Sequence, residues 1–479
     1  MSATLLPRRL FINGTSVFGG EAIARVATAL MALVVARFYG LEALGNYGYA
    51  LALASVLLIV PDFGLHLFVV REIASSSQRL PEVFWNVHWL KLGLTATVAA
   101  FAVCFGEWGI ADRERRLLFY LLVLRIVLQS FSQATMAVFK ALERMQYIAL
   151  QQSVNSTVVV AWAAVSLASD AGLPVMVAGL LVGQLAETLM GWFILRRLMR
   201  HTHRTWNSKI MTQIAAASFP FGLTAILLAL NLRIDVLVLS RYVSSRILGQ
   251  FNAAVWFMIA MFLGASLLMS VLFPKLSRML SEGSGPGCDY VRSLLKNGLM
   301  FTVLGSLLVW VSAPGIINVA FGPDFQPAAY LLRILAPVLP LVFLNTIFFY
   351  VFAAARRRFV CLVTLSVGLA FGTWLSVQLT SRYGAAGTAT ADVAREFLMS
   401  GMYLCFLIQG KQARPAGVAL LKVFAAATGL LALAVLFGSA FEVRFMWLAA
   451  WMLFVLMGAL VTLGLPRIEE WRLLTDDRL

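Results

Sequence analysis

Long apolar stretches alternate with short polar connections along the whole chain. A helix needs roughly 20 apolar residues to cross about 30 Å of hydrocarbon, and turn residues and charges interrupt the sequence at such intervals, without the ten-residue alternation of a membrane barrel. About fourteen stretches are long enough, and they lie at 11–36, 43–70, 84–106, 117–139, 147–168, 173–195, 212–239, 247–273, 294–318, 327–352, 359–380, 384–408, 416–437 and 445–465. The pattern predicts an all-α polytopic membrane protein.

Two motifs occur twice in the chain. The arginine and the Leu-Gly pair of residues 37–45 return at 241–249, an offset of 204. The Ala-Gly pair at 178–179 returns at 386–387, an offset of 208, and a glutamate follows it in both places. Internal duplication is common in secondary transporters, in which the site lies between the repeats. We therefore expect two six-helix lobes related as parallel repeats.

The duplication also predicts how the chain is divided. Residues 1–205 would form the N-terminal lobe, 206–410 the C-terminal lobe, and 411–479 two extra helices and a cytoplasmic tail. With the N-terminus inside, most of the 38 lysines and arginines fall in loops on one side of the membrane. Because basic loops stay in the cytoplasm, we expect both termini there.

Composition agrees with a membrane protein and narrows its partners. Apolar residues make up 61% of the chain and charged residues 13%, which would leave a soluble domain covered in exposed hydrocarbon. The net charge of +16 is explained by a basic cytoplasmic face that meets anionic headgroups, so membrane lipids, and not nucleic acid, are the expected partner. The four cysteines are scattered, which predicts neither a disulfide framework nor a metal site.

Features that a nucleotide-driven pump or a membrane enzyme would need are missing from the sequence. It contains no Gly-rich phosphate loop, and the predicted outer connections are short, whereas sugar polymerases and ligases usually need an ordered outer loop. The outer cluster of Arg113, Arg115 and Arg116 is interpreted as a solvated helix start. We expect a transporter without a cofactor rather than an enzyme.

Charges within the predicted helices are the best candidates for a site, because each costs about 2.5–3.5 kcal/mol at a helix centre unless it faces a partner or a wet cavity. The basic candidates are Arg25, Arg125, Arg233, Arg333 and Arg395. The acidic candidates, for ion coupling or helix bracing, are Glu21, Asp62, Glu187, Asp235, Asp392 and Glu396.

An alternative interpretation of each charge is an ion pair that joins two helices. Glu21 and Arg25 are four residues apart and share a helix face, whereas Arg125 has no acidic neighbour in its own helix. Lys91 lies close enough to a helix end to snorkel. A basic, water-filled cavity would suit an anionic cargo, and the planar fork of arginine suits phosphate.

Several segments carry a family resemblance. They are 36–49, which includes Gly-Asn-Tyr-Gly-Tyr, 62–65, the turn at 139–145, and 218–222 together with the Arg-Ile-Asp of 233–235. These segments resemble the polysaccharide repeat-unit (Wzx-type, O-antigen or exopolysaccharide) flippases of the multidrug/oligosaccharidyl-lipid/polysaccharide exporter superfamily. The resemblance runs through most of the chain and is weakest over the last two helices.

The resemblance implies gradient-driven alternating access that moves polyprenyl-diphosphate-linked oligosaccharides from the cytoplasmic to the outer leaflet of the bacterial inner membrane. Such proteins serve the biosynthesis of lipopolysaccharide or exopolysaccharide, beside a polymerase and chain-length machinery. The resemblance also implies a cationic cavity, in which Arg25, Arg125 and Arg233 would contact diphosphate or acidic sugar. Three alternatives stay open: a flippase of lipid-linked peptidoglycan precursors, a multidrug exporter of the same superfamily, and a membrane polysaccharide polymerase or ligase.

Overall fold

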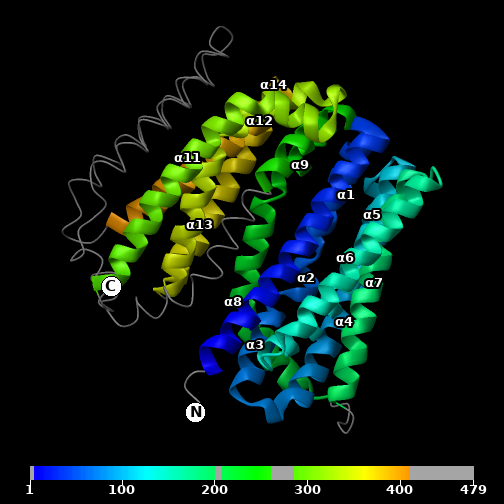
Figure 1. The fold of residues 1–479 in the computed structure, drawn as a ribbon, viewed down its shortest axis with the longest axis vertical. Coiled ribbons are helices and arrows are strands. Elements are labelled where there is room, and N and C mark those ends of the chain that lie inside the picture. The colour runs from blue at the N-terminus through cyan, green and yellow to red at the C-terminus, as the bar shows by residue number, and fades with distance from the viewer. Residues whose placement is uncertain (1–4, 200–205, 260–284, 356, 409–479) are drawn as a thin grey trace. The chain divides into compact units, whose positions relative to one another are not determined.

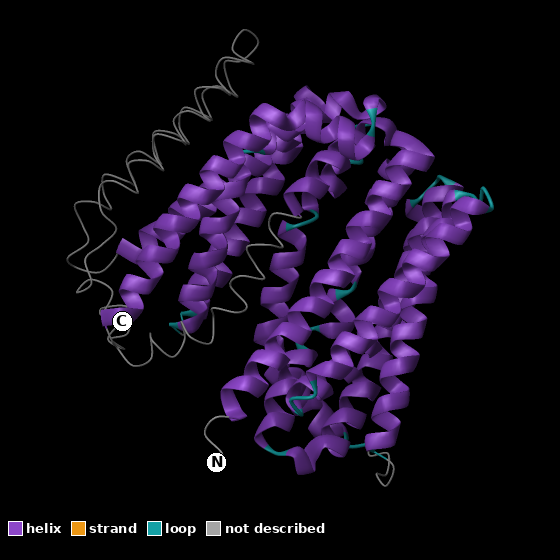
Figure 2. Cartoon of the chain, in the orientation of Figure 1, coloured by secondary structure: helices purple, strands orange, loops and turns teal. Residues whose placement is uncertain are grey.

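The described part of the chain is entirely helical. The computed structural model describes residues 5–199, 206–259, 285–355 and 357–408. Within these ranges the backbone forms helices joined by short loops, and no strand is present (Figures 1 and 2). The chain divides into two compact units, Met1–Arg233 and Ile234–Leu479. The predicted all-α class is confirmed for the described residues.

The N-terminal unit is a bundle of long helices. Its helices are α1 (Leu5–Leu57), α2 (Ile59–Asp62), α3 (Leu65–Ser75), α4 (Leu80–Gly109), α5 (Arg113–Ala141), α6 (Met145–Ala168), α7 (Leu173–Leu198) and α8 (Ser208–Asn231), with a 3₁₀ turn, η1 (Ser77–Arg79). Helices α5, α6 and α7 pack against one another, and α1 packs against α5 and α6. Helix α8 packs on α3, so it joins this unit, whereas the lobe boundary near residue 205 stays a prediction.

The C-terminal unit is also helical, with more interrupted helices. They are α9 (Ile234–Leu239), a helix over 245–259, α11 (Gly285–Phe321), the 3₁₀ turn η2 (Pro323–Phe325), α12 (Gln326–Leu335), α13 (Val338–Ala354) and α14 (Arg358–Ile408). Helix α14 packs against α9, α12 and α13. The axis bends by 50° between the segments Pro323–Leu335 and Val338–Ala354, where Pro337 lacks the amide proton that would continue the helix.

Glycines mark two places where predicted spans meet. The predicted span 11–36 falls in α1, and a break at Gly40 (φ 82°, ψ −170°) separates it from the span 43–70, which begins in α1 and continues through α2 into α3. The spans 359–380 and 384–408 both fall in α14 and are separated at Gly384 (φ 57°, ψ −135°). Backbone at positive φ favours glycine because glycine has no Cβ atom. Each break therefore divides one continuous helical run into two segments.

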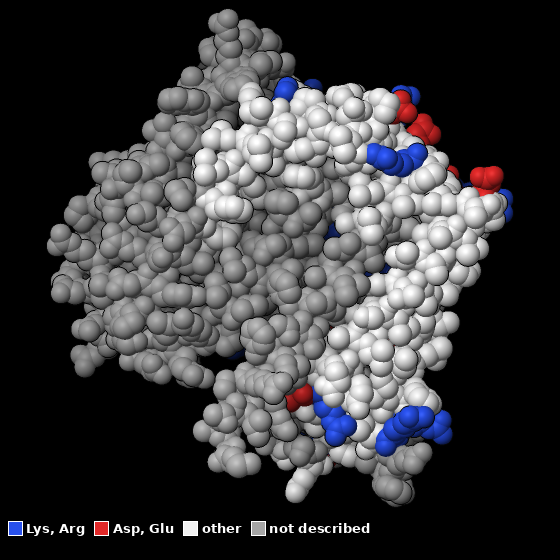
Figure 3. Space-filling view, viewed as in Figure 1, with Lys and Arg blue, Asp and Glu red and all other residues white. Residues whose placement is uncertain are grey.

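Seven helices in the described residues are long and apolar enough to cross a membrane, or up to nine if each bent pair is one span. Many large apolar side chains on them are exposed, among them Phe101, Val165 and Phe301. On the face shown in Figure 3, most of the visible charges gather toward the top and bottom of the view, and the surface between is mainly uncharged. The chain is thus a multi-pass membrane protein.

The predicted number of about fourteen helices and the cytoplasmic termini stay predictions. The last two predicted spans, 416–437 and 445–465, lie outside the described residues, as does part of 247–273.

Small residues let the helices approach closely enough to exchange polar contacts. A Cβ atom at Gly179 would lie 2.5 Å from the ring of Trp162, and one at Gly183 would lie 2.5 Å from Oδ1 of Asn155. In α14, a Cβ atom at Gly387 would lie 2.2 Å from the backbone oxygen of Leu379, across the break at Gly384. Close backbone approach at small residues is how membrane helices gain packing energy.

Gly387→Ala tests the close approach in α14. A methyl group against backbone forces the two segments apart, and overpacking of this kind costs about 1–3 kcal/mol. The matched control is Gly93→Ala in α4, where a Cβ atom would have nothing within 4 Å and alanine should be neutral or stabilising. We expect thermal unfolding of the purified protein to shift down for Gly387→Ala and to hold or rise for Gly93→Ala. Equal shifts in the unfolding temperature of the two variants would contradict the close contact between Gly387 and Leu379.

Candidate functional site

A network of neutral donors surrounds Glu187 inside the N-terminal unit. The side chain lies on α7 and is 5% exposed. One carboxylate oxygen accepts a hydrogen bond from the hydroxyl of Ser132 on α5, and the other accepts one from Nδ2 of Asn155 on α6, at 2.6 Å. Nε2 of Gln151 donates to the backbone oxygen of Glu187 at 3.2 Å. The acid therefore joins α5, α6 and α7 without a cation at hydrogen-bonding distance among the described side chains.

Gly183 and Gly191, one turn on either side of Glu187, make room for this network. A Cβ atom at Gly183 would meet Asn155, and one at Gly191 would meet Nε2 of Gln151 at 2.0 Å. Residues four apart lie on the same face of a helix. The sequence therefore builds one face of α7 from a glutamate flanked by glycines, and that face receives the polar side chains of α6.

Arg125 lies near this network but is not bonded into it. Its side chain is on α5, within electrostatic range of Glu187 and of the Tyr47 hydroxyl. Its Nε atom is buried and has no hydrogen-bond partner. The Tyr47 hydroxyl also lies within electrostatic range of Arg233, at the end of the same unit. Two of the predicted basic candidates thus flank one buried tyrosine.

A buried ion pair braces the break between α2 and α3. Nζ of Lys91 donates to Oδ1 of Asp62 at 2.9 Å and to the backbone oxygen of Ser130 at 3.1 Å. Oδ2 of Asp62 is 2.5 Å from Nδ1 of His66, one turn further on. The expectation that Lys91 snorkels to a membrane surface is wrong, because its side chain is fully buried. Asp62 provides the counter-charge that offsets the cost of this burial.

The same break packs against α8. Phe63 and Gly64 have positive φ values of 32° and 75°, so the chain turns there. A Cβ atom at Gly64 would lie 2.7 Å from Cβ of Phe221, and one at Gly222 would lie 2.7 Å from the ring of Phe63. Two of the segments that carry the family resemblance, 62–65 and 218–222, are therefore in direct contact.

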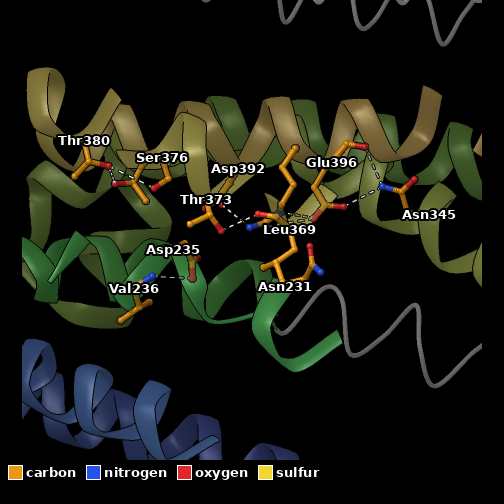
Figure 4. A network of polar contacts seen from close by, with 12 residues as sticks. Asn231, Asp235, Val236, Asn345, Leu369, Thr373, Ser376, Thr380, Asp392 and Glu396 are labelled. Atoms are coloured by element: carbon orange, nitrogen blue, oxygen red, sulfur yellow. Dashed lines mark hydrogen bonds and ion pairs between the residues drawn. The ribbon is translucent and has the colours of Figure 1, made fainter. Parts of the chain in front are cut away.

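The acidic candidates of the C-terminal unit gather around one arginine (Figure 4). Arg395 on α14 forms ion pairs with Asp392 at 3.0 Å and with Glu396 at 3.3 Å. Asp235 on α9 lies within electrostatic range of both Asp392 and Arg395. The stem of Arg395 lies over Gly372, where a Cβ atom would come within 2.6 Å of it. Asp392 and Glu396, four residues apart on α14, therefore share one counter-ion.

Helix α13 completes this cluster. Nδ2 of Asn345 donates to Oε2 of Glu396 at 2.9 Å and to its backbone oxygen at 3.0 Å. The hydroxyl of Ser400 donates to Oδ1 of Asn345 at 2.8 Å. Asn345 thus contacts Glu396 as Asn155 and Gln151 contact Glu187, through both the carboxylate and the backbone.

The remaining basic candidates lie elsewhere. Nε of Arg333 on α12 donates to the backbone oxygen of Trp310 at 3.2 Å, and its guanidinium carbon lies 5.4 Å from the centre of the Trp310 ring. Glu21 and Arg25 fall in α1, but their side chains lie outside the part that the structure describes. No three His, Cys, Asp or Glu side chains among the described residues are grouped so as to hold a metal ion.

Several members of these networks were missed by the sequence analysis because they are uncharged. Each of these residues lies in an apolar segment, where a polar side chain needs a partner. They are Tyr47, Ser132, Asn155, Gln151 and Asn345. That requirement was a usable signal. It does not identify the partner, because each bond joins different helices.

The fold is similar to that of solved membrane transporters. The chain is similar to a solved structure of the lipid II flippase MurJ in an inward closed conformation, with 15% identity, 92% of this chain and 98% of that chain covered, and a TM-score of 0.70. It is also similar to an inward-facing multidrug resistance MATE family transporter of the MOP superfamily, with 13% identity, 83% and 96% covered, and a TM-score of 0.67. At such identities the likeness shows the fold.

A sequence comparison gives the family. The family model described as "Polysaccharide biosynthesis protein" matches residues 11–280, which is more than half of the chain. The chain belongs to this family. No curated protein sequence matches it. The resemblance to the polysaccharide flippases of this superfamily is thereby confirmed.

Lys91→Met tests the buried ion pair. Removal of the ammonium leaves the Asp62 carboxylate without its counter-charge, and the loss of one partner of a buried pair costs about 3–5 kcal/mol. The control is Arg116→Met, which breaks the Arg116–Glu107 pair; that pair is 3.0 Å long, against 2.9 Å for Lys91–Asp62, but its side chains are 28% and 54% exposed. Such a pair is worth at most about 1 kcal/mol. We expect a large fall in melting temperature only for Lys91→Met. Similar small falls for both variants would contradict the bracing role of Lys91.

Proposed function

We propose that this protein flips polyprenyl-diphosphate-linked oligosaccharide repeat units from the cytoplasmic to the outer leaflet of the bacterial inner membrane, for surface polysaccharide biosynthesis. The observation that carries the proposal is the membership of a polysaccharide biosynthesis family on a flippase and transporter fold. The polyprenyl tail would stay in hydrocarbon while the hydrophilic headgroup crosses. The headgroup would cross by a conformational change of the protein, and no covalent bond would be made or broken. The protein is therefore proposed to be a transporter rather than an enzyme.

Two parallel lobes would provide the alternating access. The internal contacts of each unit support this part of the proposal. Arg125 and Arg333 are 208 residues apart, which is the offset of the Ala-Gly echo, and Glu187 and Glu396 each receive amide donors from a neighbouring helix. The hydroxyl of Tyr39 donates to the backbone oxygen of Ala171 at 2.7 Å, and a Cβ atom at Gly384 would lie 4.0 Å from Val243, which follows Tyr39 by 204 residues. These paired contacts support a parallel-repeat design.

Arg125 is the basic residue that best suits an anionic headgroup. Arg395 already has two carboxylate partners, and Arg333 donates to a backbone oxygen, whereas Nε of Arg125 has no partner. A guanidinium with a free donor provides both charge and a directed hydrogen bond to phosphate. Arg25 and Arg233 are proposed as further contacts along the path.

Gradients would drive the step, since no phosphate-binding loop is present in the sequence. An anionic headgroup that moves outward gains about 2.3 kcal/mol per charge for every 100 mV of inside-negative potential. Glu187 and the Asp235, Asp392 and Glu396 cluster are proposed to carry coupling protons or to brace the helices. A polysaccharide polymerase and chain-length proteins are the proposed partners on the outer side.

A flippase of lipid-linked peptidoglycan precursors is the second candidate, favoured by the MurJ-like fold. Both cargoes would present a diphosphate between a lipid and a sugar, so Arg125 suits either. Growth of cells that lack the protein distinguishes the two functions. Loss of a peptidoglycan-precursor flippase stops growth, whereas loss of a surface-polysaccharide flippase does not by itself stop growth.

Mass spectrometry of lipid-linked saccharides in cells that lack the protein tests the proposal. We expect complete repeat units to accumulate on polyprenyl diphosphate, a leaflet-access probe to find them on the cytoplasmic side, and surface polymer to be lost. Accumulation on the outer side would instead indicate a polymerase. Unchanged lipid intermediates with altered drug tolerance would indicate a multidrug exporter.

Arg125→Ala tests the proposed headgroup contact. A charge-assisted hydrogen bond is worth about 1.5–3 kcal/mol, so we expect export of surface polymer to fall about tenfold or more while the protein stays in the membrane. The control is Arg382→Ala, at an exposed position of α14, for which we expect no change. If export and abundance both hold in Arg125→Ala, the phosphate role of Arg125 is wrong.

A further inference from the structure

Tyr47 is a fully buried polar residue of the N-terminal unit. Its side chain is 0% exposed, and its hydroxyl has no hydrogen-bond partner. Buried hydroxyl groups are almost always bonded, because an unbonded one keeps the full penalty of its dehydration. Neither the helix propensity nor the apolar packing of α1 calls for this hydroxyl, since phenylalanine would fill the same space. The hydroxyl therefore points to a ligand.

A second unpaired donor lies beside it. Nε of Arg125, on α5, is also buried and without a partner, and the Arg125 guanidinium and the Tyr47 hydroxyl are within electrostatic range of each other. Arg233 adds a second positive charge within range of the same hydroxyl. Two donors with positive charge around them are what an oxyanion requires.

The nearest acid of the unit does not use these donors. Glu187 lies within electrostatic range of Arg125, but its two oxygens accept hydrogen bonds from Ser132 and Asn155. The bonds from α5 and α6 hold the carboxylate in place and leave Nε of Arg125 available. The Glu187 carboxylate, held within electrostatic range of Arg125, balances part of the positive charge of the guanidinium without accepting a hydrogen bond from Arg125 Nε or from the Tyr47 hydroxyl.

We propose that Tyr47 and Arg125 form an oxyanion subsite of the N-terminal unit that takes a phosphate oxygen, with the Tyr47 hydroxyl and Arg125 Nε as donors. This inference rests on the proposed function and deepens it, because it names Tyr47 as a cargo-binding residue. The same chemistry would accept a diphosphate on a lipid or a free inorganic anion. The subsite opens to its ligand when the helices around Tyr47 separate during transport.

Binding of farnesyl diphosphate to the purified full-length protein tests the subsite. The probes are farnesyl diphosphate, inorganic pyrophosphate and uncharged farnesol, each titrated by calorimetry. We expect Tyr47→Phe to weaken the binding of farnesyl diphosphate about tenfold, the effect of one lost hydrogen bond to a charged group. Farnesol binding should not change. The melting temperature of ligand-free Tyr47→Phe should equal or exceed that of the wild type, because the variant removes an unbonded polar group.

Tyr403→Phe is the matched control. Tyr403, in the C-terminal unit, is 1% exposed and also has a hydroxyl without a partner, but its ring packs on Phe352 at a centroid distance of 5.8 Å. We expect this variant to bind farnesyl diphosphate as the wild type does. Equal weakening by the two variants would overturn the assignment to Tyr47.

Other outcomes of these experiments also test the subsite. Unchanged farnesyl diphosphate affinity in Tyr47→Phe, or no binding to the wild type, would overturn the subsite. Pyrophosphate binding as tight as that of farnesyl diphosphate, and lost in Tyr47→Phe, would keep the subsite but make a free anion its ligand. If Tyr47→Phe clears the lipid-linked saccharides of deletion cells at the wild-type rate, the proposed subsite is wrong but the proposed flippase function is not contradicted. If no lipid-linked saccharide accumulates in deletion cells, the proposed flippase function itself is wrong.

Discussion

A charge within an apolar helix bundle has to be compensated inside that bundle, because the surrounding hydrocarbon offers neither water nor counter-ions. This protein meets the constraint in three ways. An ammonium faces a carboxylate at Lys91 and Asp62, a guanidinium is shared between carboxylates at Arg395, and Glu187 is surrounded by neutral donors. The first links α2 to α4, the second lies within α14, and the third links α7 to α5 and α6. The internal order of each unit therefore depends on where these charges find their partners.

The glycine positions follow from the same constraint. An amide or hydroxyl reaches a carboxylate on the next helix only if the backbones are close. Gly183 and Gly191 provide that room around Glu187, and Gly372 provides it beneath Arg395. Polar networks built in this way are fixed by several helices at once, so a moving headgroup would meet preorganised charges. Arg125 is the exception, since it has charge and a donor but no bonded partner.

Much of the fold could be predicted from the sequence, and less of the site. Apolar length gave the helical class, and the gap between the first two predicted spans contains Gly40, where α1 breaks. Contacts between helices could not be predicted, because hydropathy carries no information on which helices are neighbours: Lys91 and Asp62 are 29 positions apart. Tyr47 was missed since it is uncharged and no local pattern marks its unbonded hydroxyl.

The most direct test of the account is transbilayer movement of a lipid-linked oligosaccharide by the purified protein in proteoliposomes. Labelled polyprenyl-diphosphate oligosaccharide would be reconstituted with the protein, and its exposure to an external sugar-modifying enzyme would be followed with and without an imposed membrane potential. The account predicts movement that depends on the protein and quickens when the potential drives an anion along the transport direction. No movement above protein-free vesicles, with correctly folded protein in the membrane and the potential applied, would contradict it.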